Sequence, residues 1–210
     1  MNKIPLMLLL LWGMTALSQE LYVETGIISS SFDFTNSQGE QLDNLLPKAN
    51  NYIAFGLRNP LFIDNLYGAI GARYAGYGAI GSDDEVGNFM EWDMNYLELN
   101  GEVDYQLLKI QDGFLYVKAG ASLGFLIHGA QTINNRVINL KKVDEFNRTV
   151  LDTRIGLGFS YPIYRYLTCY IQYMMGKTWS PNTIISFGGD LEDLRIANNT
   201  VGIGFTIDFE

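Results

Sequence analysis

Apolar and polar residues alternate along most of the chain. In FLYVKAGASLGFLIHG, residues 114–129, every second position from Leu115 to Ile127 is apolar. The positions between them mix aromatic residues, glycine, a serine, Lys118 and His128. A period of two residues is the signature of a β-strand that lies between two different environments. The pattern therefore predicts strands with one uniformly apolar face and one mixed face.

Eight segments can be read as strands of this kind. They are residues 20–34, 50–58, 66–80, 92–108, 114–128, 148–161, 167–178 and 196–209. Their connections alternate in length, because four are long and polar and the three between them are short. An up-and-down barrel that crosses a membrane has short turns at one mouth and longer loops at the other. The predicted fold is all-β, an eight-stranded antiparallel up-and-down transmembrane β-barrel.

Alternation alone does not say which face points outward. A soluble barrel with an apolar interior, or a soluble exported sandwich, would alternate as well. The interior of an eight-stranded barrel is only just wide enough for side chains to fill. The bulky residues lie on the uniform face, whereas the mixed face is rich in glycine: Gly120, Gly124, Gly156, Gly158, Gly202 and Gly204. The bulky face is therefore expected to meet lipid, and the glycine-rich face to line the lumen.

Charged residues also fall on the mixed face. Glu24 and Asp208 lie there, together with an expected lumen charge network of Arg58, Arg73, Glu98, Glu102, Asp104, Lys118, Asp152 and Arg154. These groups could largely neutralise one another in a packed polar core, whereas a Lys or Arg on the lipid face would cost ~2–4 kcal/mol at the bilayer midplane. If the turn KIQD is symmetric, Asp104 lies opposite Lys118.

The N-terminus predicts export. Residues 1–18 have the basic start, short apolar run and small-residue end of a signal peptide, which leaves residues 19–210 as one barrel domain. An N-terminal membrane anchor is the alternative, but the apolar run is shorter than the ~20 residues that a spanning helix needs. Without Lys3, 13 basic residues face 23 acidic ones, a formal net charge of −10. That balance argues against nucleic acid as a partner.

The chain resembles the small eight-stranded outer-membrane barrels of Gram-negative bacteria, the OmpA/OmpX-like class, and the outer membrane protein beta-barrel domain family in particular. The resemblance covers the mature chain and rests on RIGLGFSYPIY (154–164), NNTVGIGFTIDFE (198–210) and the signal peptide. It implies location in the cell outer membrane, with outer-membrane lipid and lipopolysaccharide as surroundings. Barrels of this class usually end in an aromatic residue, whereas here Phe209 is followed by Glu210.

No catalytic, cofactor or metal site is predicted. His128, the only histidine, is expected at the long-loop end of its strand, where Asp83 and Asp84 could lie on the same side, and Asp190 belongs to another acidic long loop. This leaves open an outer-leaflet enzyme that uses His128 and loop carboxylates. Trp92 and Trp179 are expected in an aromatic girdle at that same end.

The leading functional hypothesis is a non-enzymatic outer-membrane barrel that has a structural role or binds a partner through its long loops, as an adhesin or an accessory subunit. The loop at residues 129–147 contains strand-like TINNRVINL, which could extend a hairpin above the membrane and expose an edge to a protein partner. A narrow ion pore lined by the lumen charges is the further alternative. No cofactor is expected.

Overall fold

A computed structural model of the chain describes residues 19–35, 45–83, 88–142, 149–179 and 193–209. The expected signal peptide, residues 1–18, lies outside this part. The strands are β1 (Glu20–Thr35), β2 (Leu45–Pro60), β3 (Leu66–Asp83), β4 (Asn88–Ile110), β5 (Gly113–Ile133), β6 (Arg136–Asn139), β7 (Val150–Tyr164), β8 (Leu167–Trp179) and β9 (Asp193–Asp208), and a short 3₁₀ helix, η2 (Leu140–Lys142), follows β6. Among the described residues, no helix is long and apolar enough to span a membrane.

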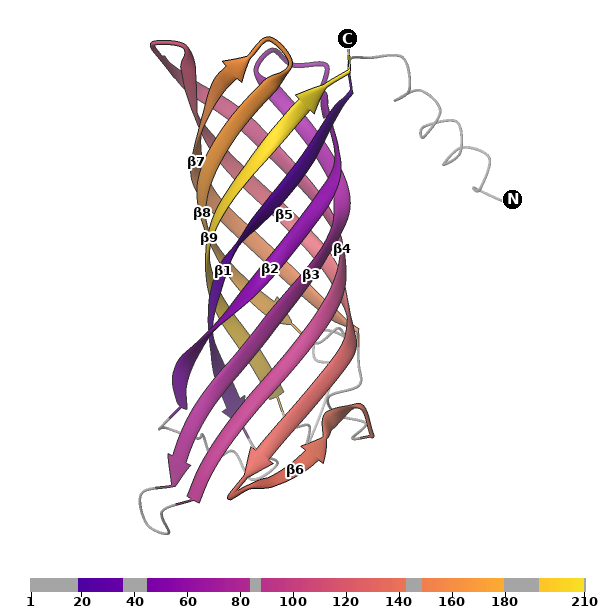
Figure 1. Cartoon of the computed structure of the whole chain (residues 1–210), viewed down its shortest axis with the longest axis vertical. Helices are drawn as coiled ribbons and strands as arrows, with labels where there is room; N and C mark the ends of the chain where they lie inside the picture. Colours follow the sequence, from indigo (N-terminus) through magenta and orange to yellow (C-terminus); the bar gives the residue numbers. More distant parts are fainter. Residues whose placement is uncertain (1–18, 36–44, 84–87, 143–148, 180–192, 210) are drawn as a thin grey trace, which may run out of the picture.

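Eight of these strands form a closed antiparallel barrel. Each pairs with its neighbour along the chain, β5 pairs with β7, and β1 closes the wall against β9. The short turns and the C-terminus lie at the upper end in Figure 1, and β6 stands off the wall at the lower end. The predicted fold and all eight strands are therefore confirmed. The strands are longer than predicted, mostly at the long-loop end.

An apolar belt surrounds the outside of the barrel. Outward residues that are 42–59% exposed include Phe55, Ile70, Leu99, Phe125, Leu157 and Ile203. On β4 the belt runs from Leu97 to Leu107, which matches the ~9–11 residues that a tilted strand needs to cross a bilayer. Towards the long loops it ends at polar outward positions: Ser29, Asn51, Asn95, Lys177 and Asn199. Because β4 has 23 residues, the barrel continues well beyond the belt on that side.

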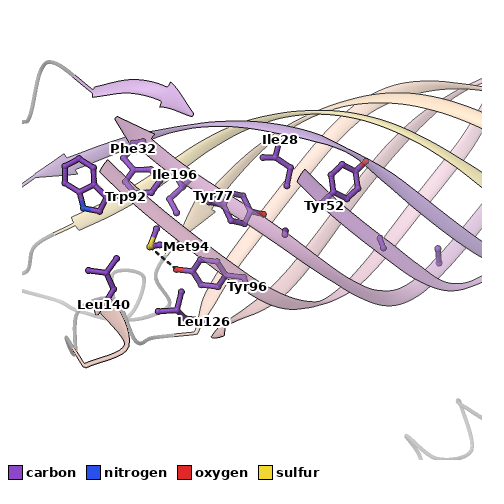
Figure 2. Packing of buried hydrophobic residues seen from close by; sticks show 14 of the residues in the cluster. Ile28, Phe32, Tyr52, Tyr77, Trp92, Met94, Tyr96, Leu126, Leu140 and Ile196 are labelled. Carbon is purple, nitrogen blue, oxygen red and sulfur yellow. Dashed lines mark hydrogen bonds between the residues drawn. The ribbon is translucent and has the colours of Figure 1, made fainter. Parts of the chain in front are cut away.

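Beyond the belt the pattern inverts, so that apolar residues point inward. We call this group the apolar plug; it consists of Ile28, Phe32, Trp92, Met94, Tyr96, Leu126, Leu140 and Ile196, each at most 7% exposed. Figure 2 shows these side chains spread along the end of the barrel, with Tyr52 labelled farther from Trp92 and Leu140. Trp92 and Phe32 lie with their ring centroids 6.2 Å apart. This part of the barrel is built like a soluble one, since water replaces lipid outside it.

Glycine makes room for tyrosine inside the belt. The nearest side chain to a Cβ placed on Gly158 would be that of Tyr116, and a Cβ on Gly204 would meet Tyr170 in the same way. Gly71 faces the Tyr22 hydroxyl, and Gly202 faces the Tyr52 hydroxyl. These rings pack across the lumen on backbone that carries no side chain. The predicted use of glycine to thin the crowded interior is confirmed.

Candidate functional site

A layer of four buried charges crosses the lumen at mid-height, and we call it the charge layer. Arg73 on β3 and Glu98 on β4 are directly opposite in register, with Arg73 Nε 3.0 Å from Glu98 Oε2. On β7, Arg154 Nε lies 2.9 Å from Asp152 Oδ2. Arg154 also lies 3.7 Å from Glu98, which links the two pairs. Two positive and two negative side chains make the layer formally neutral. All four residues are 1–5% exposed, so the layer is shielded from water.

Neutral groups complete the charge layer. The Tyr77 hydroxyl donates to Glu98 Oε1 at 2.6 Å and accepts a hydrogen bond from Arg73 at 3.0 Å. Thr178 and Asn198 both donate to Asp152 Oδ1, at 3.1 and 2.9 Å. Buried charges need such additional hydrogen bonds to offset the free energy of desolvation. The layer therefore links five strands of the wall, β3, β4, β7, β8 and β9.

A second set of charges lies closer to the short turns. Arg58 bonds Glu20 at 2.6 Å and contacts both carboxylate oxygens of Asp104, at 3.2 and 2.6 Å. Lys118 lies 3.3 Å from Glu102. The expected register of Asp104 opposite Lys118 is confirmed, but the two do not form the ion pair. Arg58 on β2 reaches Asp104 across β3 by passing the small inward Ala69 and lying over the ring of Tyr67, which leaves Glu102 to Lys118.

Glu24 forms a third polar centre without contacting a cation. Its carboxylate accepts hydrogen bonds from the Tyr52 hydroxyl at 2.5 Å, the Tyr170 hydroxyl at 2.8 Å and the Gln172 amide at 2.9 Å. Glu24 is 5% exposed. The buried charge is therefore satisfied by neutral donors. All eight residues of the expected network lie in the lumen in these pairs.

A cavity of about 190 Å³ opens from the charge set around Arg58 and Lys118 towards the short-turn mouth. We call it the short-turn cavity. Its lining includes Glu20, Arg58, Asp104 and Lys118 with the aromatic rings of Tyr22, Tyr67, Tyr116 and Tyr170. The guanidinium of Arg58 lies 3.7 Å from the ring centroid of Tyr67. Alternation alone could not reveal the cavity, because it depends on which tyrosines lean over which glycines.

At the opposite end, β5 and β6 form the hairpin that TINNRVINL predicts. Its two-residue turn is Asn134–Asn135, both with positive φ, as a tight hairpin turn requires. Asn134 is tied to Phe89 on β4 by hydrogen bonds in both directions, at 3.1 and 3.0 Å. After β6, Leu140 returns into the apolar plug and is 1% exposed. The hairpin is thus fixed to the barrel at its tip and at its base.

His128 lies at the long-loop end of β5 as expected, but it does not face the lumen. A register shift places Tyr96 opposite Leu126 and Asn95 opposite His128, so Ile127 is the extra residue of a β-bulge. His128 is therefore exposed on the outer wall beside the outward Asn95. Of the loop carboxylates, Asp84 and Asp190 lie outside the described residues. Within the described part of the chain, no three His, Cys, Asp or Glu residues are grouped as metal ligands.

Trp92 corrects a second expectation. It lies inside the plug at 6% exposure rather than in an outer girdle, because β4 has already left the apolar belt at this point. Trp179 does lie on the outer wall, where its indole donates to Thr153 at 3.3 Å. A sequence signal for the difference exists. In β4 the inward positions change from Glu98 to Trp92 and Met94, while outward positions change from leucine to Asn95.

No family model matches the chain, and no curated protein matches it in sequence. Among solved structures, it is similar to the outer membrane protein OprG from Pseudomonas aeruginosa, with a TM-score of 0.51 at 12% identity over 92% of this chain and 97% of that one. Neisserial surface protein A matches with a TM-score of 0.48 at 10% identity, over 90% and 97% of the two chains. Ail from Yersinia pestis gives 0.39 at 12% identity, over 90% and 98%. At these identities the likeness concerns the fold, and that fold is the small eight-stranded transmembrane barrel of the outer membrane.

Proposed function

We propose that the mature chain, residues 19–210, is a non-enzymatic barrel of the cell outer membrane that binds a protein partner at its long-loop end. In this proposal residues 1–18 direct export, the apolar belt contacts membrane lipid, and the long-loop end meets lipopolysaccharide and the cell exterior. The fold alone does not specify a function, since one fold hosts many. The proposal therefore rests on the strand edge that β6 exposes and on the side chains that fill the lumen.

The observation that carries the proposal is the β5–β6 hairpin. Within the described part of the chain, β6 pairs with β5 alone, so its other edge has no strand partner. An exposed strand edge is a template for an added strand of another protein. The hydrogen bonds of Asn134 and the burial of Leu140 hold this edge in place.

Val137 is the centre of this edge. The residues that flank a two-residue turn, Ile133 and Arg136, form a hydrogen-bonded pair, so the next pair, Thr132 and Val137, does not. The backbone N–H of Val137 therefore points away from β5, and its side chain is 68% exposed. Exposed Arg136, Lys141 and Lys142 surround it with positive charge. The edge suits an extended partner segment with acidic side chains.

The lumen gives less support to the two alternatives. An enzyme would need His128 beside acidic partners, and His128 instead stands beside Asn95 on the outer wall. A pore would need a continuous passage, and the charge layer and the apolar plug both cross the lumen with side chains at most 7% exposed. A filled lumen is what an eight-stranded barrel is expected to contain.

Partner binding at β6 can be tested with Val137→Pro. Proline removes the outward N–H but leaves the hydrogen bonds between β5 and β6 intact, because Val137 does not donate to β5. The matched control is Val137→Ala, which shortens the side chain and keeps the N–H. Proteins crosslinked in intact cells to the wild type and to Val137→Ala, but lost from Val137→Pro, would support strand addition. An identical set of crosslinked proteins for all three would contradict it.

A further inference from the structure

We propose that the short-turn cavity binds a small organic cation, an alkylammonium of about the size of choline. The site lies at the opposite end of the barrel from β6 and does not depend on the proposed partner. A ligand would enter through the short-turn mouth, which in the proposed orientation faces the periplasm. It could not leave through the other mouth, because the charge layer lies beyond the cavity.

The size of the cavity limits the ligand. Sites for drug-sized molecules have volumes of roughly 300–1,000 Å³, whereas an engineered cavity of about 150 Å³ holds benzene. At about 190 Å³, the short-turn cavity has room for a molecule slightly larger than benzene. A lipid, a peptide or a sugar chain would not fit within it.

The charges around the cavity favour a positive ligand. Glu20 and Asp104 line it, and Glu24 and Glu102 lie next to it, bonded to the lining residues Tyr170 and Lys118. Among the described residues, two largely buried cations face these four carboxylates, Arg58 and Lys118, while the exposed Lys109 lies with its Nζ 5.6 Å from the ring centroid of Phe114, which also lines the cavity. Arg58 is shared between Glu20 and Asp104, and Glu24 contacts neutral donors only. Without the solvent-exposed Lys109, the four carboxylates exceed the two largely buried cations by two formal negative charges in a space partly closed off from bulk water, where electrostatic attraction is stronger than in bulk water.

Aromatic faces supply the second element of recognition. Tyr22, Tyr67, Tyr116 and Tyr170 line the cavity. Two of these rings already hold a cation, because the Lys118 ammonium lies 5.7 Å from the Tyr116 centroid and 5.5 Å from that of Tyr170. Rings of this kind attract ammonium groups through the negative potential of their faces. Tyr67, stacked on Arg58 near the mouth, would meet an entering ligand first.

The test uses the refolded mature barrel in dodecyl maltoside, because detergents with phosphocholine or amine-oxide head groups could occupy the site themselves. Choline chloride is titrated while backbone amide signals are followed by NMR. We expect saturable shifts at cavity residues such as Tyr67 and Lys118, and none at Met94 in the apolar plug. The comparison ligand is 3,3-dimethyl-1-butanol, which has the shape of choline without its charge. This neutral alcohol is expected to bind at least about tenfold more weakly than choline.

Two variants localise the effect. Glu20→Gln removes one lining carboxylate at the rim, where a change in packing is tolerated, and should weaken choline binding several-fold. Asp93→Asn removes a carboxylate at the far end of the barrel, where Asp93 bonds Lys48 at 2.9 Å, and should leave binding unchanged. The proposal is overturned if choline produces no saturable shifts, if the neutral alcohol binds equally well, or if Asp93→Asn weakens binding as much as Glu20→Gln does.

Discussion

At the scale of single residues, the lumen is organised by short side chains that let long ones reach. Arg58 crosses β3 to Asp104 past the short side chain of Ala69 and over the ring of Tyr67, and Tyr116 lies on Gly158, which has no side chain to fill that space. Charges and rings therefore interlock across strands that are not neighbours. A charged residue in the charge layer therefore contacts several buried partners, whereas a charged residue near the long loops contacts few.

Replacement of Glu98 tests this difference. Glu98 is 1% exposed, so Glu98→Gln leaves the buried Arg73 and Arg154 without a full counter-charge. This change is expected to lower the free energy of unfolding by about 3–5 kcal/mol. The matched control is Glu91→Gln at the long-loop end, which breaks an ion pair with Lys48 at 2.9 Å and should cost less than about 1 kcal/mol. Denaturant unfolding in lipid vesicles measures both. Equal losses would mean that the charge layer is solvated rather than buried.

At the scale of strands, alternation predicts the barrel because each strand inside the membrane separates lipid from a polar lumen. The strand positions and the inward glycines follow from that contrast, whereas the register of Asp104 against Lys118 is predicted from the short turn KIQD. The choice of ion-pair partner does not, because Arg58 approaches Asp104 from a strand that is not its neighbour. A period of two residues shows on which face a side chain lies. It does not show how far a long side chain extends across the lumen.

Alternation also failed to predict two local features of the strands. The bulge at Ile127 turns His128 outward, and an inserted residue looks in sequence like continued alternation. The inversion beyond the belt moved Trp92 from the expected girdle into the apolar plug. Here the sequence does hold a signal, since apolar residues change faces along β4, but reading it requires knowing where the membrane ends.

Fluorescence of Trp92 tests the inversion. In mature Trp179→Phe, Trp92 is the remaining tryptophan, and its emission should be blue-shifted, poorly quenched by aqueous acrylamide and insensitive to brominated lipid. A buried position inside the wall is reached by neither quencher. The reciprocal variant, Trp92→Phe, leaves Trp179 on the outer wall, where quenching should be clearly stronger. Strong quenching of Trp92 by brominated lipid would contradict its inward position and indicate that it lies in an outer aromatic girdle.

At the scale of the whole molecule, the barrel divides into three parts along its axis. A partly open cavity faces the short-turn mouth, a neutral charge layer seals the middle, and an apolar plug fills the part that extends beyond the belt. The two ends are thus separated by two unlike barriers, one built from ion pairs and one from packed side chains. Binding at one mouth can therefore proceed without a passage to the other.

This division predicts that the wild-type barrel conducts no resolvable current in a planar lipid bilayer. An ion on the axis would have to displace the apolar plug and then enter a layer whose charges already neutralise one another, and desolvation there is costly. A variant with Trp92, Met94 and Leu140 all changed to serine would hydrate the plug but keep the charge layer, and it should stay silent as well. Its migration on a gel without boiling should remain that of a folded barrel, which shows that silence does not reflect misfolding. Steps of current in the wild type would contradict both barriers, and steps in the variant alone would mean that the plug is the only seal.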